Sequence, residues 1–174
     1  MRRRSALKTI GGVAIGSTLA GCLGGGTGTL ATRVSDQPGD IGDFETLLIQ
    51  VNGVRVKPAD GELEELDADA EVDLTELTGD ASALVDEAEL DAGDYEFLQL
   101  LAEATEATLA EGGSATVRLP GDAPLTFEQA FEIREGETTT FIADFTPVKR
   151  GGTDEYVLQP VATEVEVVYG TVTG

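Results

Sequence analysis

Apolar and polar residues alternate over several short segments of the chain, which is the two-residue period of a half-buried β-strand. In the segment 46–57 the apolar side chains share a face on each side of Asn52-Gly53: Leu47, Ile49 and Val51 before it, Val54 and Val56 after it. An Asn-Gly pair suits either a tight turn or a β-bulge. The segment therefore predicts a turn between two strands or one longer strand with a bulge.

Further strand-like runs are rich in Val, Thr, Phe and Tyr and are separated by turn residues. The runs are 115–119, 138–145, 155–159 and 163–168. The turn signals are the Gly- and Pro-containing segments 120–122, 135–137 and 150–152. Short strands at this spacing predict an all-β fold, an antiparallel β-sandwich with at most one short helix.

Two segments are harder to assign. The segment 81–90 is predicted as a short helix. The segment 98–111 fits a helix whose face carries Leu98, Leu101, Thr105 and Leu109. It also fits the end of a strand whose face carries Tyr95, Phe97, Gln99 and Leu101.

The first 22 residues have the pattern of an export signal. Basic residues precede an apolar stretch at 9–20, which is shorter than the roughly 20 residues of a bilayer span. Arg3-Arg4, followed by Ser5-Ala6-Leu7-Lys8, resembles the start of a twin-arginine signal. Leu19-Ala20-Gly21-Cys22 resembles a lipobox, in which the Cys22 thiol accepts a lipid. We predict a signal peptide at 1–21, a lipid-anchored Gly-rich tether at 22–29 and one sandwich domain at 30–170.

The chain is strongly acidic, with 33 Asp and Glu against 11 Lys and Arg and a net charge of -22. Removal of the predicted signal leaves seven basic residues against 33 acidic ones, a net charge of -26. The acids are dispersed from Asp36 to Glu166, which is typical of proteins that stay hydrated in molar salt, where screening acts over about 3 Å. Clustered Lys and Arg are absent, so nucleic acid is excluded as a partner.

Several kinds of chemistry are excluded by residue type. The chain has no His, which rules out a Ser-His-Asp triad and a histidine-bound zinc site. A single Cys rules out an intrachain disulfide. Paired carboxylates could hydrolyse glycosides, but among 33 acids some pair reaches the required separation by chance. Tyr95 and Tyr156, each near a turn, are predicted as core tyrosines with hydrogen-bonded hydroxyls.

Two groups of acids could bind a cation. In the segment 36–45, Asp36, Asp40 and Asp43 lie beside two glycines whose carbonyls could add oxygen ligands for Ca²⁺. The alternative is a structural turn in which Asp36 accepts backbone hydrogen bonds. A second group alternates with apolar residues and is predicted as the wet face of an edge strand or loop rather than a cation site: Asp67, Asp69, Glu71 and Asp73.

Five segments in order resemble the domain-of-unknown-function family 4382 (DUF4382), which occurs on secreted and lipid-anchored archaeal and bacterial proteins. They are 34–44, 72–77, 90–95, 141–145 and 156–161, and the resemblance covers about residues 30–168. It implies a β-sandwich related to transthyretin-like or immunoglobulin-like modules, and it favours a strand at 95–105. It implies no activity, because the family has none assigned.

The sequence therefore predicts a non-enzymatic binding, adhesion or structural module of a halophilic cell envelope. Its location would be the extracellular face of the cell membrane, held by the lipid on Cys22. Its partner would be an unknown surface protein or carbohydrate, with no cofactor required. The alternative is a Ca²⁺-dependent binding module that uses Asp36, Asp40 and Asp43.

Overall fold

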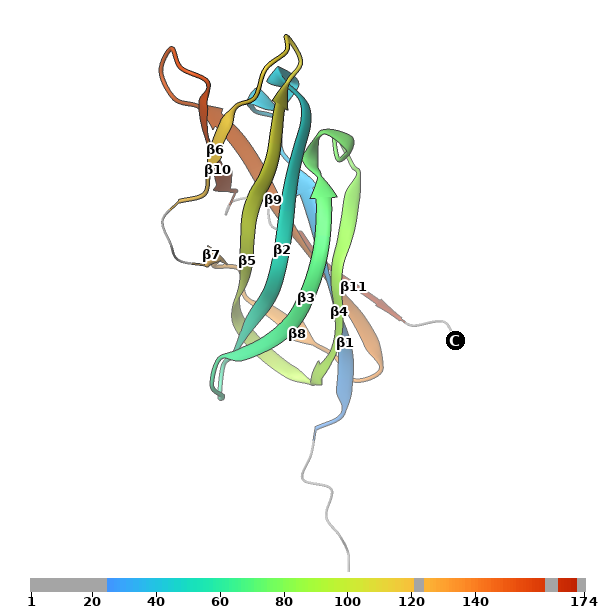
Figure 1. Cartoon of the computed structure of the whole chain (residues 1–174). Helices are drawn as coiled ribbons and strands as arrows, with labels where there is room; N and C mark the ends of the chain where they lie inside the picture. The colour runs from blue at the N-terminus through green and yellow to red at the C-terminus, as the bar shows by residue number, and fades with distance from the viewer. Residues whose placement is uncertain (1–24, 121–123, 162–165, 172–174) are drawn as a thin grey trace, which may run out of the picture.

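The protein consists of two β-sheets packed face to face (Figure 1). The computed structural model describes residues 25–120, 124–161 and 166–171. The first sheet has the strand order β4-β1-β9-β10-β6, and β11 also pairs with β9. These strands are β1 (Thr27–Asp36), β4 (Ser82–Asp91), β6 (Thr116–Arg118), β9 (Glu137–Lys149), β10 (Glu155–Pro160) and β11 (Glu166–Thr171).

The second sheet has the strand order β3-β2-β5-β7, and β8 also pairs with β5. Its strands are β2 (Phe44–Pro58), β3 (Glu64–Asp73), β5 (Gly93–Leu109), β7 (Leu125–Phe127) and β8 (Phe131–Ile133). Two short 3-10 helices, η1 (Asp40–Asp43) and η2 (Leu74–Glu76), lie in the connections β1–β2 and β3–β4. The predicted all-β sandwich is confirmed.

Most strand pairs are antiparallel, but the first sheet contains two parallel pairs. β1 runs parallel to β9, and β6 runs parallel to β10. The pairing of β1 with β9 joins the beginning of the domain to a strand about 110 residues later, so β1 lies between β4 and β9 inside the sheet. The sandwich is therefore mixed where the alternation of residues predicts only antiparallel pairs.

The break at Asn52-Gly53 is a bulge inside one long strand. The register of β2 against β3 and β5 shifts between Val51 and Gly53. A bulge adds one residue and returns the next apolar positions to the inner face. All five apolar residues of this segment are consequently buried: Leu47, Ile49, Val51, Val54 and Val56.

Bulges also explain two wrong predictions. The segment 81–90 forms strand β4, not a helix, and Val85 is the extra residue of a bulge opposite Thr32/Arg33. That bulge shifts the inward side from odd to even positions, so that Val85 and Leu90 both reach the core, which hides the two-residue period. In β5 a register shift near Glu96 changes the inward residues, so Tyr95 is followed by Leu98 and Leu100 and not by the predicted Phe97, Gln99 and Leu101.

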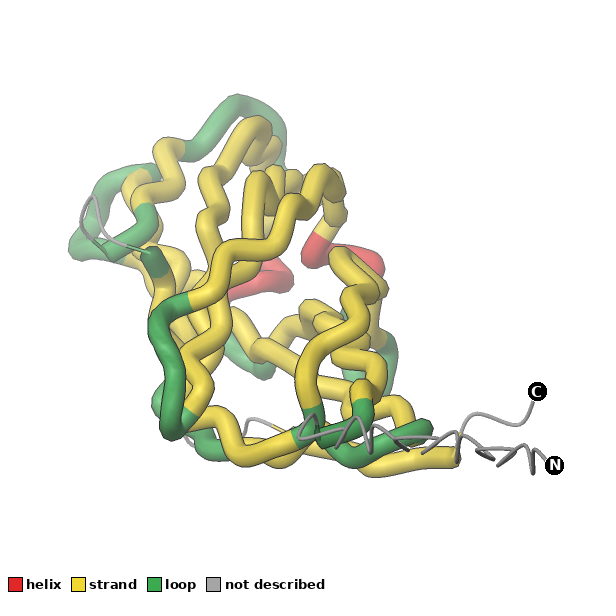
Figure 2. Tube along the Cα trace, turned by 90° about the horizontal axis from the view of Figure 1, so that it is seen from below, coloured by secondary structure: helices red, strands yellow, loops and turns green. Residues whose placement is uncertain are grey.

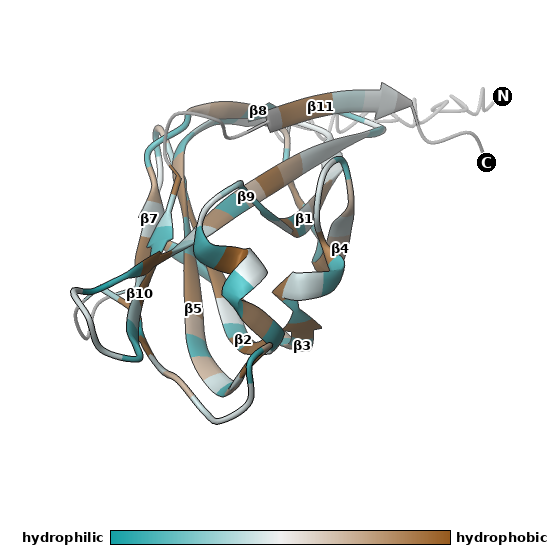
Figure 3. Cartoon of the chain, turned by 90° about the horizontal axis from the view of Figure 1, so that it is seen from above, coloured by the Kyte–Doolittle hydropathy of each residue, from teal (hydrophilic) through white to brown (hydrophobic). Residues whose placement is uncertain are grey.

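The core lies between the inner faces of the two sheets (Figure 2). Phe127 of the second sheet contacts Phe141 and Phe145 of β9 edge-on, with ring centroids 6.3 and 5.7 Å apart. Such aromatic pairs add to the stability that burial alone supplies. Hydrophobic and hydrophilic bands alternate along the strands (Figure 3), as two-residue periodicity requires.

The two ends of the sandwich are built from different connections (Figure 1). We call the end where β1 begins the proximal end; there the Ala92 amide donates to the Gly26 carbonyl over 2.8 Å. We call the opposite end, with η1 and the β9–β10 turn, the distal end. The first strand begins at Thr27, three residues before the predicted start of the domain, so residues 27–29 belong to β1 and not to a tether.

Candidate functional site

The predicted signal peptide and the lipidation residue Cys22 lie outside the described residues. No helix in the described part of the chain is long and apolar enough to cross a membrane. The remaining predicted site residues, Asp36, Asp40 and Asp43, are all placed at the distal end.

The acidic turn does not gather its carboxylates around one point. Asp40 Oδ2 accepts a hydrogen bond from the Lys149 backbone amide over 2.7 Å. Asp43 Oδ2 accepts one from the Tyr156 hydroxyl over 2.7 Å and lies 3.7 Å from Lys149 Nζ. Both carboxylates thus fasten η1 to the β9–β10 hairpin, which is a structural role.

Asp36 has a different environment from its two predicted partners. It is only 4% exposed, and its Oδ1 has no hydrogen-bond partner among the described residues. Asp144 of the neighbouring strand is equally buried; it accepts hydrogen bonds from Ser35 Oγ and from Gln37 Nε2, the latter over 3.2 Å. Burial, together with the charge of Asp144, raises the pKa of Asp36 to about 7.

The predicted Ca²⁺ site is therefore not supported by the geometry. In residues 25–120, 124–161 and 166–171, no group of three or more acidic or Cys side chains could hold a metal ion. The second acidic group lies where it was predicted, on an edge strand, because β3 is the last strand of its sheet. Asp67, Asp69 and Glu71 are exposed there, and Asp73 caps η2 by accepting from the Thr75 amide over 3.0 Å.

The feature that sequence reasoning missed is a hollow of about 590 Å³ on the first sheet at the distal end. It forms because β6 pairs with β10 over only three residues, ending at Arg118↔Val157, while β10 continues to Pro160. The side chains beside this open edge include Arg118, Val157 and Pro160, and Arg150 joins them from the β9–β10 turn. We call this site the distal hollow.

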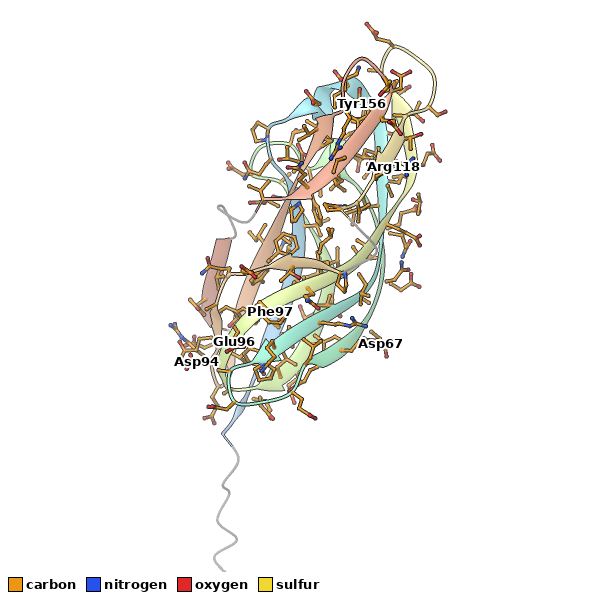
Figure 4. The ribbon with its side chains drawn as sticks, turned by 90° about the vertical axis from the view of Figure 1, so that its left-hand side faces the viewer. Asp67, Asp94, Glu96, Phe97, Arg118 and Tyr156 are labelled. Carbon is orange, nitrogen blue, oxygen red and sulfur yellow. The ribbon has the colours of Figure 1, made fainter. Side chains whose placement is uncertain are left out.

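The distal hollow has a net positive lining, whereas the molecule as a whole is strongly negative. Two arginines and one glutamate, Glu155, line the hollow, in a chain whose net charge is -22. Arg118 Nη2 lies 3.5 Å from Glu155 Oε1, and these side chains are 69% and 50% exposed. Arg150 makes no ion pair with any residue that the structure describes. The hollow thus offers guanidinium groups that are accessible to an anion (Figure 4 labels Arg118).

The apolar part of the distal hollow comes from Leu119, Pro120, Val157 and Pro160. Tyr156 lies beneath, with its ring buried against Phe44 at a centroid distance of 4.6 Å. Burial, reinforced by the hydrogen bond to Asp43, raises the pKa of the Tyr156 hydroxyl. The Tyr156 ring is therefore buried and its hydroxyl is hydrogen-bonded to Asp43, as predicted for a core tyrosine.

The basic residues carry the sequence signal that could have indicated this site. Only seven occur after residue 8, and three of them meet at the distal end: Arg118, Lys149 and Arg150. Their proximity depends on the parallel pairing of β6 with β10, which joins residues about 40 positions apart. Alternation of apolar residues does not predict that pairing.

Comparison with known proteins gives one family. The family model described as "Domain of unknown function (DUF4382)" matches residues 27–160. The match begins at the first residue of β1 and ends at the last residue of β10. Neither the curated proteins nor the solved structures gave a match to the chain.

Proposed function

Because the chain belongs to the DUF4382 family, whose description names no activity, we propose its function from its own residues. It is a non-enzymatic binding module, held at the extracellular face of the membrane by a lipid on Cys22. The observation that carries this proposal is the position of the distal hollow. Its strands β6 and β10 lie toward the end of the sandwich opposite the beginning of β1 (Figure 1), and Figure 4 labels its residue Arg118.

The short connection between Cys22 and the domain would keep the proximal end close to the bilayer. Only residues 23–26 separate Cys22 from β1, and four extended residues span at most about 14 Å. The proximal end would consequently face the bilayer. Residues 156–160 of the distal hollow pair with residues 145–149 of β9, which begins at the proximal end with Glu137. At about 3.3 Å per residue, the distal hollow would stand roughly 25–40 Å above the proximal end.

The residues of the distal hollow favour binding over catalysis. Its lining includes one carboxylate, Glu155, which is next to Arg118. The Tyr156 hydroxyl donates to Asp43 rather than into the hollow. A chain without His also lacks the commonest general base near neutral pH.

Membrane fractionation of cells that express the full chain tests the anchor. The parent protein should sediment with membranes, resist extraction by carbonate and enter the soluble phase with detergent. Cys22→Ser removes the thiol that accepts the lipid and should move most of the protein to the soluble fraction. Ser5→Ala, a matched change in the signal region, should leave the parent distribution unchanged.

Protease treatment of intact cells tests the exposed side. We expect the protease to digest the parent protein on intact cells, without lysis. Membrane retention of Cys22→Ser, or protection of the parent protein until lysis, would overturn the proposal.

A further inference from the structure

We propose that the distal hollow binds a small organic monocarboxylate with an apolar body. This inference rests on the proposed function only in taking the chain to be a binding module; it does not depend on the lipid anchor. The ligand class follows from three properties of the hollow, namely its charge, its apolar wall and its size.

The charge of the hollow suits one negative charge. Arg118 and Arg150 exceed Glu155 by one positive charge. The planar guanidinium group matches a carboxylate with two parallel hydrogen bonds, and it does so better than an ammonium group. A ligand with a single carboxylate balances the lining, whereas a doubly charged phosphate leaves an excess negative charge in a chain that already has net charge -22.

Salt explains why an anion can approach so acidic a protein. In molar salt the repulsion between a free anion and distant carboxylates is screened within about 3 Å. Only groups in direct contact then determine binding, and in the distal hollow these include two guanidinium groups. Direct hydrogen bonds and apolar contacts are less sensitive to screening, so both parts of the hollow remain effective.

The apolar wall of the distal hollow favours a ligand that has an apolar body as well as a charged group. Leu119, Val157 and Pro160 lie beside the arginines, and burial of an apolar body against them removes apolar surface from water. The volume of about 590 Å³ is within the range of about 300–1,000 Å³ that small-molecule sites occupy. Acetate is too small to use this wall, and an aromatic or medium-chain acid uses it well.

Calorimetry on the detergent-solubilised full chain in about 3 M KCl tests the inference, with phenylacetate as the probe. The comparison ligands are benzyl alcohol, which lacks the carboxylate, acetate, which lacks the apolar body, and inorganic phosphate. We expect saturable binding of phenylacetate at one site and at least tenfold weaker binding of each comparison ligand.

Two variants assign the binding to the hollow. Arg118→Gln and Arg150→Gln should each weaken phenylacetate binding at least tenfold, which corresponds to about 1.4 kcal/mol. The matched control is Arg55→Gln, because Arg55 is paired with Glu65 at 2.6 Å on the second sheet. Its binding should equal that of the parent. Both test side chains are exposed, so circular dichroism should show unchanged folding.

The outcomes separate this inference from the proposed function. Equal binding of benzyl alcohol, tighter binding of phosphate, or unchanged affinity in the Arg variants overturns the monocarboxylate assignment. If another comparison ligand binds and Val157→Asp abolishes its binding, the hollow remains a binding site of a different class. Absence of binding for all four ligands rejects the inference, while the Cys22→Ser fractionation independently decides the anchor.

Discussion

Each end of the sandwich has a buried tyrosine, and a hollow at the proximal end is lined by charges opposite to those of the distal hollow. The proximal hollow, about 310 Å³, is lined by the acids Asp60, Glu64, Asp91 and Asp94, and by no basic residue among those described. The distal hollow has two arginines and one glutamate. Dispersed acids are the background of this surface, so a local excess of positive charge is more informative than another acidic group.

The two tyrosines show that both ends are nevertheless stabilised in the same way. Tyr95 stacks on Phe131 at 5.2 Å and donates to the Asp91 carbonyl over 2.9 Å. Tyr156 packs on Phe44 and donates to the Asp43 carboxylate. Burial, with the nearby charges of Glu64 and Asp91, raises the pKa of Tyr95 to about 12. A buried, hydrogen-bonded tyrosine thus stabilises each end, whereas the charges that line the two hollows differ.

The largest expected effect tests that shared support. Tyr95→Ala and Tyr156→Ala each remove a ring that is at most 2% exposed, so each should lower the free energy of unfolding by about 3–5 kcal/mol. Urea unfolding in about 3 M KCl measures both. A loss below about 1 kcal/mol at one end only would show that the two ends are not equivalent.

The second-largest expected effect on the free energy of unfolding concerns the distal end, because it depends on Asp36. Its pKa is about 7 in the folded protein and 3.8 when unperturbed, so the folded state retains a proton that the unfolded state has released. Stability is therefore greatest below pH 4 for this group and falls as the pH rises to 7, by about 4 kcal/mol at about 1.4 kcal/mol per unit.

Asp36→Asn should abolish this fall and stabilise the protein above pH 7. Urea unfolding at pH 4, 5.5 and 8 measures it, with Asp94→Asn at the exposed proximal end as the control. If the free energy of unfolding changes with pH in the same way for the parent and for Asp36→Asn, burial of Asp36 does not control its protonation.

A smaller effect on the free energy of unfolding distinguishes the two tyrosine hydroxyls. Tyr95→Phe and Tyr156→Phe each lose one hydrogen bond and should each cost about 1 kcal/mol. The Tyr156 acceptor is a side chain, so a double-mutant cycle with Asp43→Asn should reveal coupling at the distal end. The combination Tyr95→Phe with Asp43→Asn is the additive control; coupling there would contradict the separation of the two ends.

The smallest effect tests the opposite charges directly. At low KCl, Asp94→Asn should raise stability and Arg118→Gln should lower it, each within about 0.5 kcal/mol. Both differences should vanish in about 3 M KCl because of screening. Thermal unfolding at the two salt concentrations measures both changes in stability. If both variants changed the stability in the same direction, opposite charges at the two hollows would not explain the effects.

Local alternation was sufficient to predict the sandwich, and Asn52-Gly53 indicated the bulge of β2 as one of two possibilities, but the bulges of β4 and β5 were not predicted. The strand at 46–57 and the exposed acids of β3 follow directly from two-residue periodicity. β4 was predicted wrongly because the bulge at Val85 disguises the period, and bulges depend on the partner strand. Cross-strand register likewise made Asp36 a buried neighbour of Asp144 instead of a member of an acidic turn.

The distal hollow could not be predicted for a related reason. Its arginines are 32 positions apart, and they meet only because a three-residue strand pairs in parallel with β10. Composition shows that basic residues are rare, but it does not show that Arg118 and Arg150 line one surface. The order of the strands in the first sheet supplies that information.

The internal position of β1 has a mechanical consequence. β1 is hydrogen-bonded to β4 on one side and to β9 on the other over most of its length. These bonds are roughly transverse to the strand, so a pull along β1 from its N-terminal end loads them together in shear instead of opening them one at a time. Force on the beginning of the domain is thereby distributed over two neighbouring strands, and β9 transmits it directly to the turn that carries Arg150.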